Sequence, residues 1–418
     1  MKICLLSKSD GRGGGFSAAY RLHQGLLRSG ADSIMLVHDG TRGDRSVFFP
    51  KSKWDLGLTK LASTLDELPL SLYKQRQPGI FSLQWFPDRL THRLARIAPD
   101  ILNLHWINTA FLRIETLAKF NRPIVWTLHD MWPFTGGCHY NGECDRYTGS
   151  CGACPMLGSH RDLDISRWVW HRKAKAWKNL NMTLVSPSRW LADRARASSL
   201  FQDFRIEVIP NGLDIQQYKP IDRKVARNLL GLPLDKPIVL FGAISATGDS
   251  RKGFHLLLPA LQKLAHRTTG ENRPELVVFG SSSPADPPDF GLKTHYLGKF
   301  QDDLSLVLLY SAADVFVAPS LQDNLPNTIV ESLACGTPCV AFNIGGMPDL
   351  IDPGENGYLA KPFDIEDLAE GILWVLEEPE RYERLRGNAR EKVEREFSLE
   401  LQAKNYRSLY EELCISSS

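Results

Sequence analysis

Short apolar runs alternate with segments of helical length along the whole chain. The first run, 2–7, leads into a glycine-rich loop, a helical pattern over 16–28 and a second apolar run at 33–38, an order that predicts a β-α-β unit. Continuous apolar runs flanked by helices are typical of parallel strands that are buried on both faces of a sheet. Further strands are expected at 101–105, 124–129 and 183–186.

The same pattern begins again in the second half, after the turn Pro210-Asn211-Gly212, with a strand expected at 206–209 before it. We therefore expect an α/β chain of two doubly wound, Rossmann-like domains that face each other across a cleft. The first covers 1–208, the second 209–395, and a helix over 396–418 crosses back to the first. In such sheets ligands bind outside the carboxyl ends of the strands. The second-half strands are expected at 238–242, 276–280, 315–319 and 339–342.

Charge is distributed unevenly between the halves. The 418 residues carry a net charge of +2, but residues 1–210 hold 29 Lys+Arg against 18 Asp+Glu, whereas 211–418 hold 21 against 30. A basic first half favours binding to an anionic surface or substrate. The alternative is solvated surface charge that has accumulated by chance and has no binding role. No recognised nucleic-acid-binding module accompanies it, so we expect no nucleic-acid partner. The N-terminus lacks a signal-peptide pattern and no long apolar run is present, which predicts a cytoplasmic protein.

Four short motifs occur in a fixed order along the chain. Gly13–Gly15 follows the first expected strand, and residues 209–214 read IPNGLD. Arg251-Lys252-Gly253 precedes a helical segment, and Asp323 and Glu331 lie eight positions apart in a run that ends at Pro338. Together these motifs resemble the retaining glycosyltransferases of family 4, which have the GT-B fold.

This resemblance implies that the chain moves a hexose from a UDP- or GDP-sugar, without a catalytic metal and with retention of anomeric configuration. Glu331 would accept hydrogen bonds from ribose hydroxyls, and Asp323 would lie near the donor sugar. Arg251 and Lys252 supply cations where diphosphate charge must be offset. Backbone N–H groups would assist them, at Gly13, Gly14 and Gly15 and at Asn324 and Leu325 beside a helix N-terminus.

Two positions depart from the family pattern. The first acidic residue is Asp323, one methylene shorter than the usual glutamate, and Gly242 is followed by Ala243 where the family often has arginine. These departures keep a second hypothesis open, in which the chain is a non-catalytic subunit that binds nucleotide-sugar in a glycan biosynthesis complex.

Thr127-Leu128-His129-Asp130 ends an expected strand, where the family carries an active-site histidine. His129 would then lie against the donor sugar from the opposite wall of the cleft, and a core histidine is the alternative. His105 also ends a strand, and we expect a structural role for it.

Four of the eight cysteines fall in the insert 136–160, at Cys138, Cys144, Cys151 and Cys154. The terminal C-x-x-C pair is typical of a structural zinc site, with disulfides and free or redox-active thiols as alternatives. The insert resembles a subgroup of exopolysaccharide and colanic-acid-type transferases. It follows His129 directly, so we expect it to shape the acceptor side, with a lipid-linked or polysaccharide acceptor.

The segment 167–178, RWVWHRKAKAWK, combines tryptophans with cations at helical spacing. Such a helix suits peripheral contact with an anionic leaflet at the inner face of the plasma membrane. The alternative is a domain helix whose tryptophans are core and whose cations are solvated.

Overall fold

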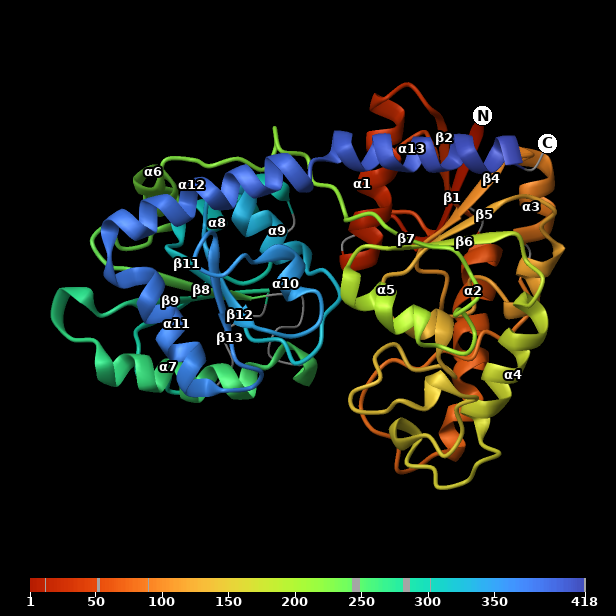
Figure 1. Ribbon diagram of the computed structural model, residues 1–418, viewed down its shortest axis with the longest axis horizontal. Coiled ribbons are helices and arrows are strands. Elements are labelled where there is room, and N and C mark those ends of the chain that lie inside the picture. Colours follow the sequence, from red (N-terminus) through yellow and green to blue (C-terminus); the bar gives the residue numbers. More distant parts are fainter. Residues whose placement is uncertain are drawn as a thin grey trace. The chain divides into compact units, whose positions relative to one another are not determined.

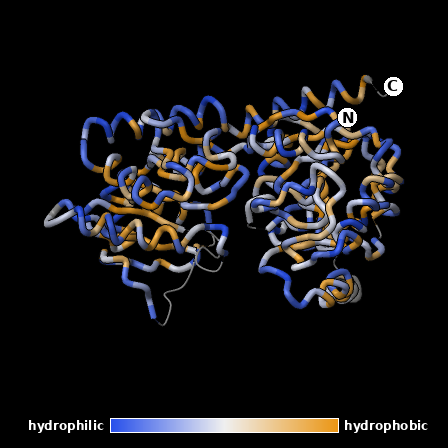
Figure 2. Tube along the Cα trace, turned by 60° about the horizontal axis from the view of Figure 1, so that its bottom comes forward, coloured by the Kyte–Doolittle hydropathy of each residue, from blue (hydrophilic) through white to orange (hydrophobic). Residues whose placement is uncertain are grey.

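The computed structural model describes residues 1–11, 13–50, 53–88, 90–242, 249–280, 286–300 and 302–416. The chain forms two compact units, one made of Met1–Pro210 with Gln402–Ser418 and the other of Asn211–Leu401. Each unit has a parallel sheet with helices on both faces (Figure 1). Hydrophobic residues gather in the interior of each unit (Figure 2), which is the arrangement expected for doubly wound α/β domains. The α/β fold class is thereby confirmed.

The sheet of the first unit has seven parallel strands within the described residues, in the order β3-β2-β1-β4-β5-β6-β7. Strand β1, which lies between β2 and β4, is apolar and buried from Ile3 to Leu6, so it can be covered on both faces. The strands predicted from the apolar runs are confirmed, and the short β3 adds an edge that the sequence pattern did not indicate. Their bounds are β1 Lys2–Ser9, β2 Asp32–Asp39, β3 Val47–Phe48, β4 Ile101–Leu104, β5 Ile124–Thr127, β6 Met182–Ser186 and β7 Ile206–Val208.

Two apolar layers cover this sheet. On one face, the α1 residues Leu22 and Leu26 pack in the same cluster as Tyr406 and Tyr410 of α13. The other face holds an aromatic cluster in which the rings of Trp126, Trp132, Trp177 and Phe201 contact one another. The helices are α1 Gly14–Arg28, α2 Lys53–Glu67, α3 Leu90–Ile97, α4 Ile165–Trp177, α5 Arg189–Arg196 and α13 Leu399–Ser416.

The end of the chain is part of this first unit. Helix α13 runs beside α1 and the sheet (Figure 1), with Tyr406 and Tyr410 fully buried. The two termini lie close together, since the Cys414 thiol is 3.5 Å from the sulfur of Met1. Burial of two large aromatic side chains provides several kcal/mol of hydrophobic stabilisation, on the order of 1.5–3 each, to hold the helix in place.

In the second unit, six parallel strands of the described chain form a sheet in the order β10-β9-β8-β11-β12-β13. Helices α7 and α11 cover one face, and α8 and α9 cover the other. The strands are β8 Ile238–Gly242, β9 Glu275–Phe279, β10 Thr294–Tyr296, β11 Val315–Ala318, β12 Cys339–Phe342 and β13 Gly357–Ala360. The helices are α6 Arg223–Leu230, α7 Phe254–Arg267, α8 Asp303–Ala312, α9 Asn327–Ala334, α10 Met347–Leu350, α11 Ile365–Glu377 and α12 Pro379–Glu396.

The tryptophan- and cation-rich segment forms α4 and is largely a domain helix. Trp177 and Lys173 are buried, and Arg172 pairs with Glu115 through a 2.6 Å contact. These three side chains therefore pack into their own unit. The outward face of the segment retains Trp168, which is 45% exposed, with Lys175 and Lys178. Among the described residues, no helix has the length and apolar character needed to cross a membrane.

Candidate functional site

The Arg251-Lys252-Gly253 motif forms a tight connection into α7. Asp249 accepts a hydrogen bond from the Arg251 N–H and so caps a single 3₁₀ turn over Ser250–Lys252. Gly253 has φ +72°, and a Cβ there would lie 1.7 Å from the Pro319 carbonyl oxygen. Only glycine allows this close approach of two backbone segments. The glycine of the motif thus holds the two cations beside the loop that follows β11.

That loop carries Asp323, which the cations meet directly. Lys252 Nζ donates to Asp323 Oδ2 at 2.6 Å, and Arg251 Nη1 lies 3.4 Å from the same oxygen. Asp323 is 7% exposed. Burial alone would raise the pKa of this carboxyl, but the two cations bring the pKa below its ordinary value. Asp323 is therefore ionised at neutral pH and fixes the position of Lys252.

The residues after Asp323 are held by the loop itself. The Asn324 N–H donates to Asp323 Oδ1, and Leu325 is buried in the core of the second unit. The Gly346 N–H donates to the Asp323 carbonyl oxygen. A Cβ on Gly345 would lie 2.2 Å from the same oxygen, so this close approach requires glycine. Helix α9 begins at Asn327. Asn324 and Leu325 therefore lie just before the N-terminus of α9, and the Asn324 N–H is directed to the Asp323 carboxylate.

Glu331 lies on α9 and is 6% exposed. The Tyr310 hydroxyl, from α8, donates to Glu331 Oε2 at 3.1 Å. Burial, followed by the charge of Glu331, raises the pKa of Tyr310 well above its usual range, so the phenol stays protonated as a donor. A carboxylate accepts several hydrogen bonds, and this contact positions Glu331 for others.

In the first unit, the glycine-rich loop and His129 come together. Gly13 has φ +142° and caps α1, and a Cβ on Gly15 would lie 3.0 Å from His129 Cγ. Gly14, the first residue of α1, has open space at its Cβ position. The N-terminus of α1 therefore packs against the His129 ring, and the absence of a side chain at Gly15 allows this contact.

His129 follows β5 and lies in a polar cluster. Its Nε2 is 2.9 Å from Nδ1 of His105, and the two rings stack. Burial lowers the pKa of His129 to about 4, although the nearby Asp130 acts in the opposite direction. The imidazole is therefore neutral at pH 7. His105, for which we expected a structural role, contacts the candidate active-site residue directly.

Asp130 connects His129 to the cysteine-rich insert. Its Oδ2 accepts from His139 Nδ1 at 2.7 Å and from Trp106 Nε1 at 2.9 Å, and its Oδ1 accepts from the Trp132 N–H. Burial alone would raise the pKa of Asp130, but His139 and these donors lower it. Asp130 is thus an ionised anchor for the first residues of the insert.

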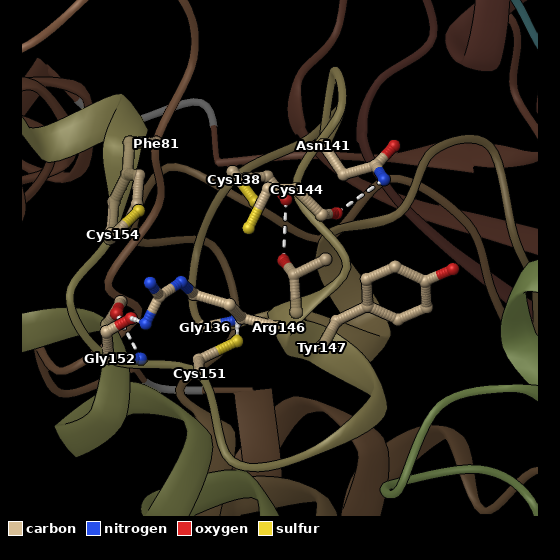
Figure 3. A pocket seen from close by; sticks show the side chains of 12 residues that line it. Phe81, Gly136, Cys138, Asn141, Cys144, Arg146, Tyr147, Cys151, Gly152 and Cys154 are labelled. Carbon is tan, nitrogen blue, oxygen red and sulfur yellow. Dashed lines mark hydrogen bonds between the residues drawn. The ribbon is translucent and has the colours of Figure 1, made fainter. Parts of the chain in front are cut away.

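The four cysteines of the insert line one pocket (Figure 3). All four are free thiols, and Cys151 Sγ accepts a hydrogen bond from the Gly136 N–H at 3.2 Å. As the side chains stand, no group of three or more His, Cys, Asp or Glu in the described residues could hold a metal ion. The pocket is lined by Phe81, Thr135, Gly136, Cys138, Asn141, Cys144, Arg146, Tyr147, Cys151, Gly152, Cys154 and Ser166.

The backbone of the C-x-x-C segment is tightly wound. Cys151, Gly152 and Ala153 all have positive φ, at 54°, 96° and 40°. Burial also raises the pKa of the Cys151 thiol to about 12. Residues other than glycine rarely adopt a positive φ, so the surrounding structure must hold Cys151 and Ala153 in this conformation. The Gly152 N–H donates to Ser166 Oγ and the Cys154 N–H donates to Asp164 Oδ2, and these two contacts hold the segment.

Two family descriptions match the chain: "Glycosyltransferase Family 4" over residues 12–217 and "Glycosyl transferases group 1" over residues 222–392. The first range contains the glycine-rich loop and His129, and the second contains Arg251, Lys252, Asp323 and Glu331. The chain belongs to the group 1 glycosyltransferases. The expectation of a glycosyltransferase is thereby confirmed at the level of group 1, whose members are transferases.

Among curated relatives, a protein named as a colanic acid biosynthesis glycosyl transferase, WcaC of Escherichia coli K12, is 25% identical over 361 residues, covering 82% of this chain and 83% of that one. A D-inositol 3-phosphate glycosyltransferase of Corynebacterium efficiens is 31% identical over 247 residues, which is 56% of this chain and 57% of the relative. The chain therefore spans little more than half of this second relative.

Solved structures share the fold. A sucrose-phosphate synthase from Thermosynechococcus elongatus superposes with a TM-score of 0.69 at 20% identity, covering 100% of both chains. Anabaena HepE, solved in complex with UDP-glucose, superposes with a TM-score of 0.62 at 18% identity, covering 99% of this chain and 100% of HepE. The group 1 glycosyltransferase therefore has the GT-B fold, as expected.

Sequence reasoning did not find the side chains that position these residues. Tyr310, which holds Glu331, is an ordinary core position in the sequence pattern. The ion pair of Lys252 with Asp323 joins residues 71 positions apart. For Lys252 and Asp323, the sequence offered one indication that they meet. Each follows a parallel strand, and the loops after such strands gather at one edge of a sheet.

The close approach at Gly253 generates a matched test. In Gly253→Ala, the new methyl collides with the Pro319 carbonyl, so the two backbone segments must move apart. Gly231→Ala is the control, because Gly231 has a similar φ of +66° but open space at its Cβ. Both variants should lose ~1–2 kcal/mol of unfolding free energy from the left-handed backbone, and Gly253→Ala should lose a further ~1–3 kcal/mol from the collision. Urea unfolding measures both free energies, and equal losses would contradict the close approach at Gly253.

Proposed function

We propose that this group 1 glycosyltransferase transfers a hexose from a UDP- or GDP-sugar to a lipid-linked or polysaccharide acceptor, with retention of anomeric configuration. The observation that carries the donor assignment is the cluster of Lys252, Arg251 and Asp323 at the loops after β8 and β11. It supplies cations beside a helix N-terminus, which suits a diphosphate. The UDP-glucose bound to Anabaena HepE supports a nucleotide-sugar donor.

In this proposal the second unit binds the nucleotide. Arg251 and Lys252 receive the diphosphate, and Glu331 accepts hydrogen bonds from the ribose hydroxyls. Asp323 holds Lys252 in place and lies near the donor sugar. Stabilising the departing diphosphate is the main catalytic contribution, since charge develops there as the anomeric bond breaks. The N–H groups at Gly13–Gly15 would assist in the first unit.

His129 serves the transfer step in the first unit. Its neutral imidazole can form a hydrogen bond with a sugar hydroxyl without adding charge. The relative named for colanic acid biosynthesis supports an acceptor in cell-surface glycan synthesis. The competing hypothesis, a non-catalytic nucleotide-sugar-binding subunit, differs in giving binding without turnover.

A thermal-shift panel of UDP, GDP, ADP and their common sugar conjugates tests the donor site. A ligand present at 100 times its Kd stabilises the folded state by ~2.7 kcal/mol, so one base and its sugar should raise Tm by several degrees. No stabilisation by any member of the panel would overturn the donor assignment.

The proposed contact of Glu331 with the ribose can be tested with nucleotides that differ at the 2′ position. Glu331→Ala should bind the ribonucleoside diphosphate about 10- to 100-fold more weakly, because hydrogen bonds to a charged group are worth ~1.5–3 kcal/mol. The variant should also stop discriminating against the 2′-deoxy nucleotide. Glu275→Ala, which removes another buried glutamate of the same unit, should leave both values unchanged. Titration calorimetry on all three proteins gives the comparison, and retained discrimination in Glu331→Ala rejects the assignment.

We also propose that Cys138, Cys144, Cys151 and Cys154 bind a structural zinc ion. Their shared pocket, the thiol donor set and the N–H donated to Cys151 support this, since thiolates prefer zinc and structural sites use four of them. Metal binding would draw the four sulfur atoms together, because in this structure they are not close enough to one another to hold an ion. Lys173, buried beside the insert, would offset part of the thiolate charge.

The zinc proposal predicts one zinc per chain in purified protein, measured by elemental analysis. Cys151→Ser should lose the metal and lower Tm by several degrees, whereas Cys414→Ser, outside the pocket, should retain it. Protein without stoichiometric zinc excludes the proposal. Alkylation before and after reduction, read by mass spectrometry, then tells free thiols from disulfides.

Contact with an anionic membrane is the last part of the proposal. The positive excess in residues 1–210 and the exposed Trp168, Lys175 and Lys178 support it. Lys175→Glu/Lys178→Glu should reduce co-sedimentation with phosphatidylglycerol vesicles several-fold, since each basic residue near the surface adds ~1 kcal/mol. Lys219→Glu/Lys224→Glu makes the same charge change in the second unit and should bind as the unmodified chain does. Equal binding of both variants would remove the membrane surface as a partner.

A further inference from the structure

The loop after β2, residues 40–46, is held to the loop after β1 by a buried carboxylate. Asp10 is fully buried, and its Oδ1 accepts from the Thr41 N–H at 2.7 Å and from the Thr41 hydroxyl at 2.9 Å. Its Oδ2 accepts from the Arg42 N–H at 3.2 Å. A carboxylate is costly to bury unless it is hydrogen-bonded, so these contacts fix the backbone at Thr41 and Arg42.

The side chain of Arg42 is fixed as well. Its Nε donates to the Asp10 carbonyl oxygen at 2.6 Å, and its guanidinium lies 4.2 Å from the centre of the Tyr20 ring. The Tyr20 hydroxyl donates to Asp44 Oδ2 at 3.1 Å. Burial and this hydrogen bond raise the pKa of Tyr20 to about 12, so the phenol stays protonated and the ring is held against the guanidinium.

The far end of the guanidinium is available to a ligand. Arg42 is exposed, and among the described residues its side chain donates through Nε only. Asp10 and Asp44 accept hydrogen bonds within the loop, and neither forms an ion pair with Arg42 in the part of the chain that the structure describes. The planar fork of Nη1 and Nη2 therefore keeps its charge and its donors for a partner.

This arginine lies at the edge of the sheet where ligands bind in α/β folds. Arg42 follows β2, the glycine-rich loop follows β1, and these two strands pair in parallel. A Cβ on Gly11 would lie 3.6 Å from Thr41 Oγ1, so the two loops are in contact. Ordering a long side chain costs rotamer entropy, and a surface arginine that meets only solvent has no need of it. The fixed fork at this edge therefore favours a binding role.

We propose that Arg42 binds a phosphate group of the acceptor through Nη1 and Nη2. The guanidinium fork matches two oxygens of a phosphate, and a fork that is already fixed loses less entropy on binding. The assignment to the acceptor rests on the proposed function, in which Arg251 and Lys252 receive the donor diphosphate in the second unit. An acceptor joined to a lipid through diphosphate and a phosphorylated sugar share this chemistry.

Titration calorimetry tests the phosphate site, with Lys252→Ala in every sample so that binding at the donor cluster is weakened. The probes are glucose 6-phosphate and geranyl diphosphate, with glucose and geraniol as neutral controls. Arg42→Gln should bind both phosphate probes at least about tenfold more weakly, because hydrogen bonds between charged groups are the strong ones. The probe with the lower Kd identifies a sugar phosphate or a lipid diphosphate as the source.

Arg45→Gln is the matched control, because Arg45 is an exposed arginine of the same loop and loses the same charge. It should bind both phosphate probes as the Lys252→Ala chain does. Arg42→Lys keeps the charge without the fork and should recover only part of the affinity. Equal binding by Arg42→Gln and Arg45→Gln would overturn the proposal, as would the absence of binding by either phosphate probe. Full recovery in Arg42→Lys would reject the two-atom contact.

A transfer assay separates the acceptor from the donor, with Lys252 intact and a membrane lipid extract as the acceptor source. Arg42→Gln should need at least about tenfold more extract for half-maximal rate, with the donor KM unchanged. A raised donor KM would assign Arg42 to the donor diphosphate and overturn the proposal. Absence of turnover in the unsubstituted chain would instead count against the proposed function and leave the calorimetric result standing.

Discussion

Both sheets are parallel and covered on each face by helices with apolar inner sides, so the loops after the strands are the main places where polar side chains can gather. In the first unit His105 follows β4 and His129 follows β5. In the second, Lys252 lies on the connection after β8 and Asp323 follows β11. The positions of these groups thus depend on the strand order, since adjacent parallel strands bring their following loops to the same edge.

Charge at the proposed donor site is balanced by ion pairs within the second unit. Asp323 is ionised and contacts Lys252 and Arg251, while Asp249 pairs with Arg251. Leaving buried Asp323 without a cation would cost several kcal/mol, so this carboxylate holds Lys252 in a fixed position. The shorter aspartate in place of the family's glutamate fits this arrangement, because Asp323 reaches Lys252 Nζ at 2.6 Å. In the proposed function, cations that are already in position reduce the reorganisation that diphosphate binding would require.

Periodicity predicted the strands well because each is a continuous apolar run, as Ile238–Gly242 and Val315–Ala318 illustrate. It missed β3, β10 and β13, which are short or partly exposed edge strands with a weaker pattern. The candidate site residues follow from local motifs, but their partners do not: Tyr310, which donates to Glu331, is one position inside the apolar helical run LVLLYSA. Ala243, a departure from the family pattern, lies outside the described residues. Lys173 was expected at a surface, and only the packing of α4 shows that it is buried.

The proposed transfer of a hexose from a nucleoside-diphosphate sugar by way of the Lys252–Asp323 site can be measured directly. The purified chain is incubated with UDP- and GDP-hexoses and a membrane lipid extract, and NMR follows nucleoside diphosphate release and the anomeric configuration of the product. We expect release coupled to a lipid-linked product with the configuration of the donor, and loss of this release in Lys252→Ala. Binding of a nucleotide sugar without turnover would contradict the proposed transfer and favour the non-catalytic subunit.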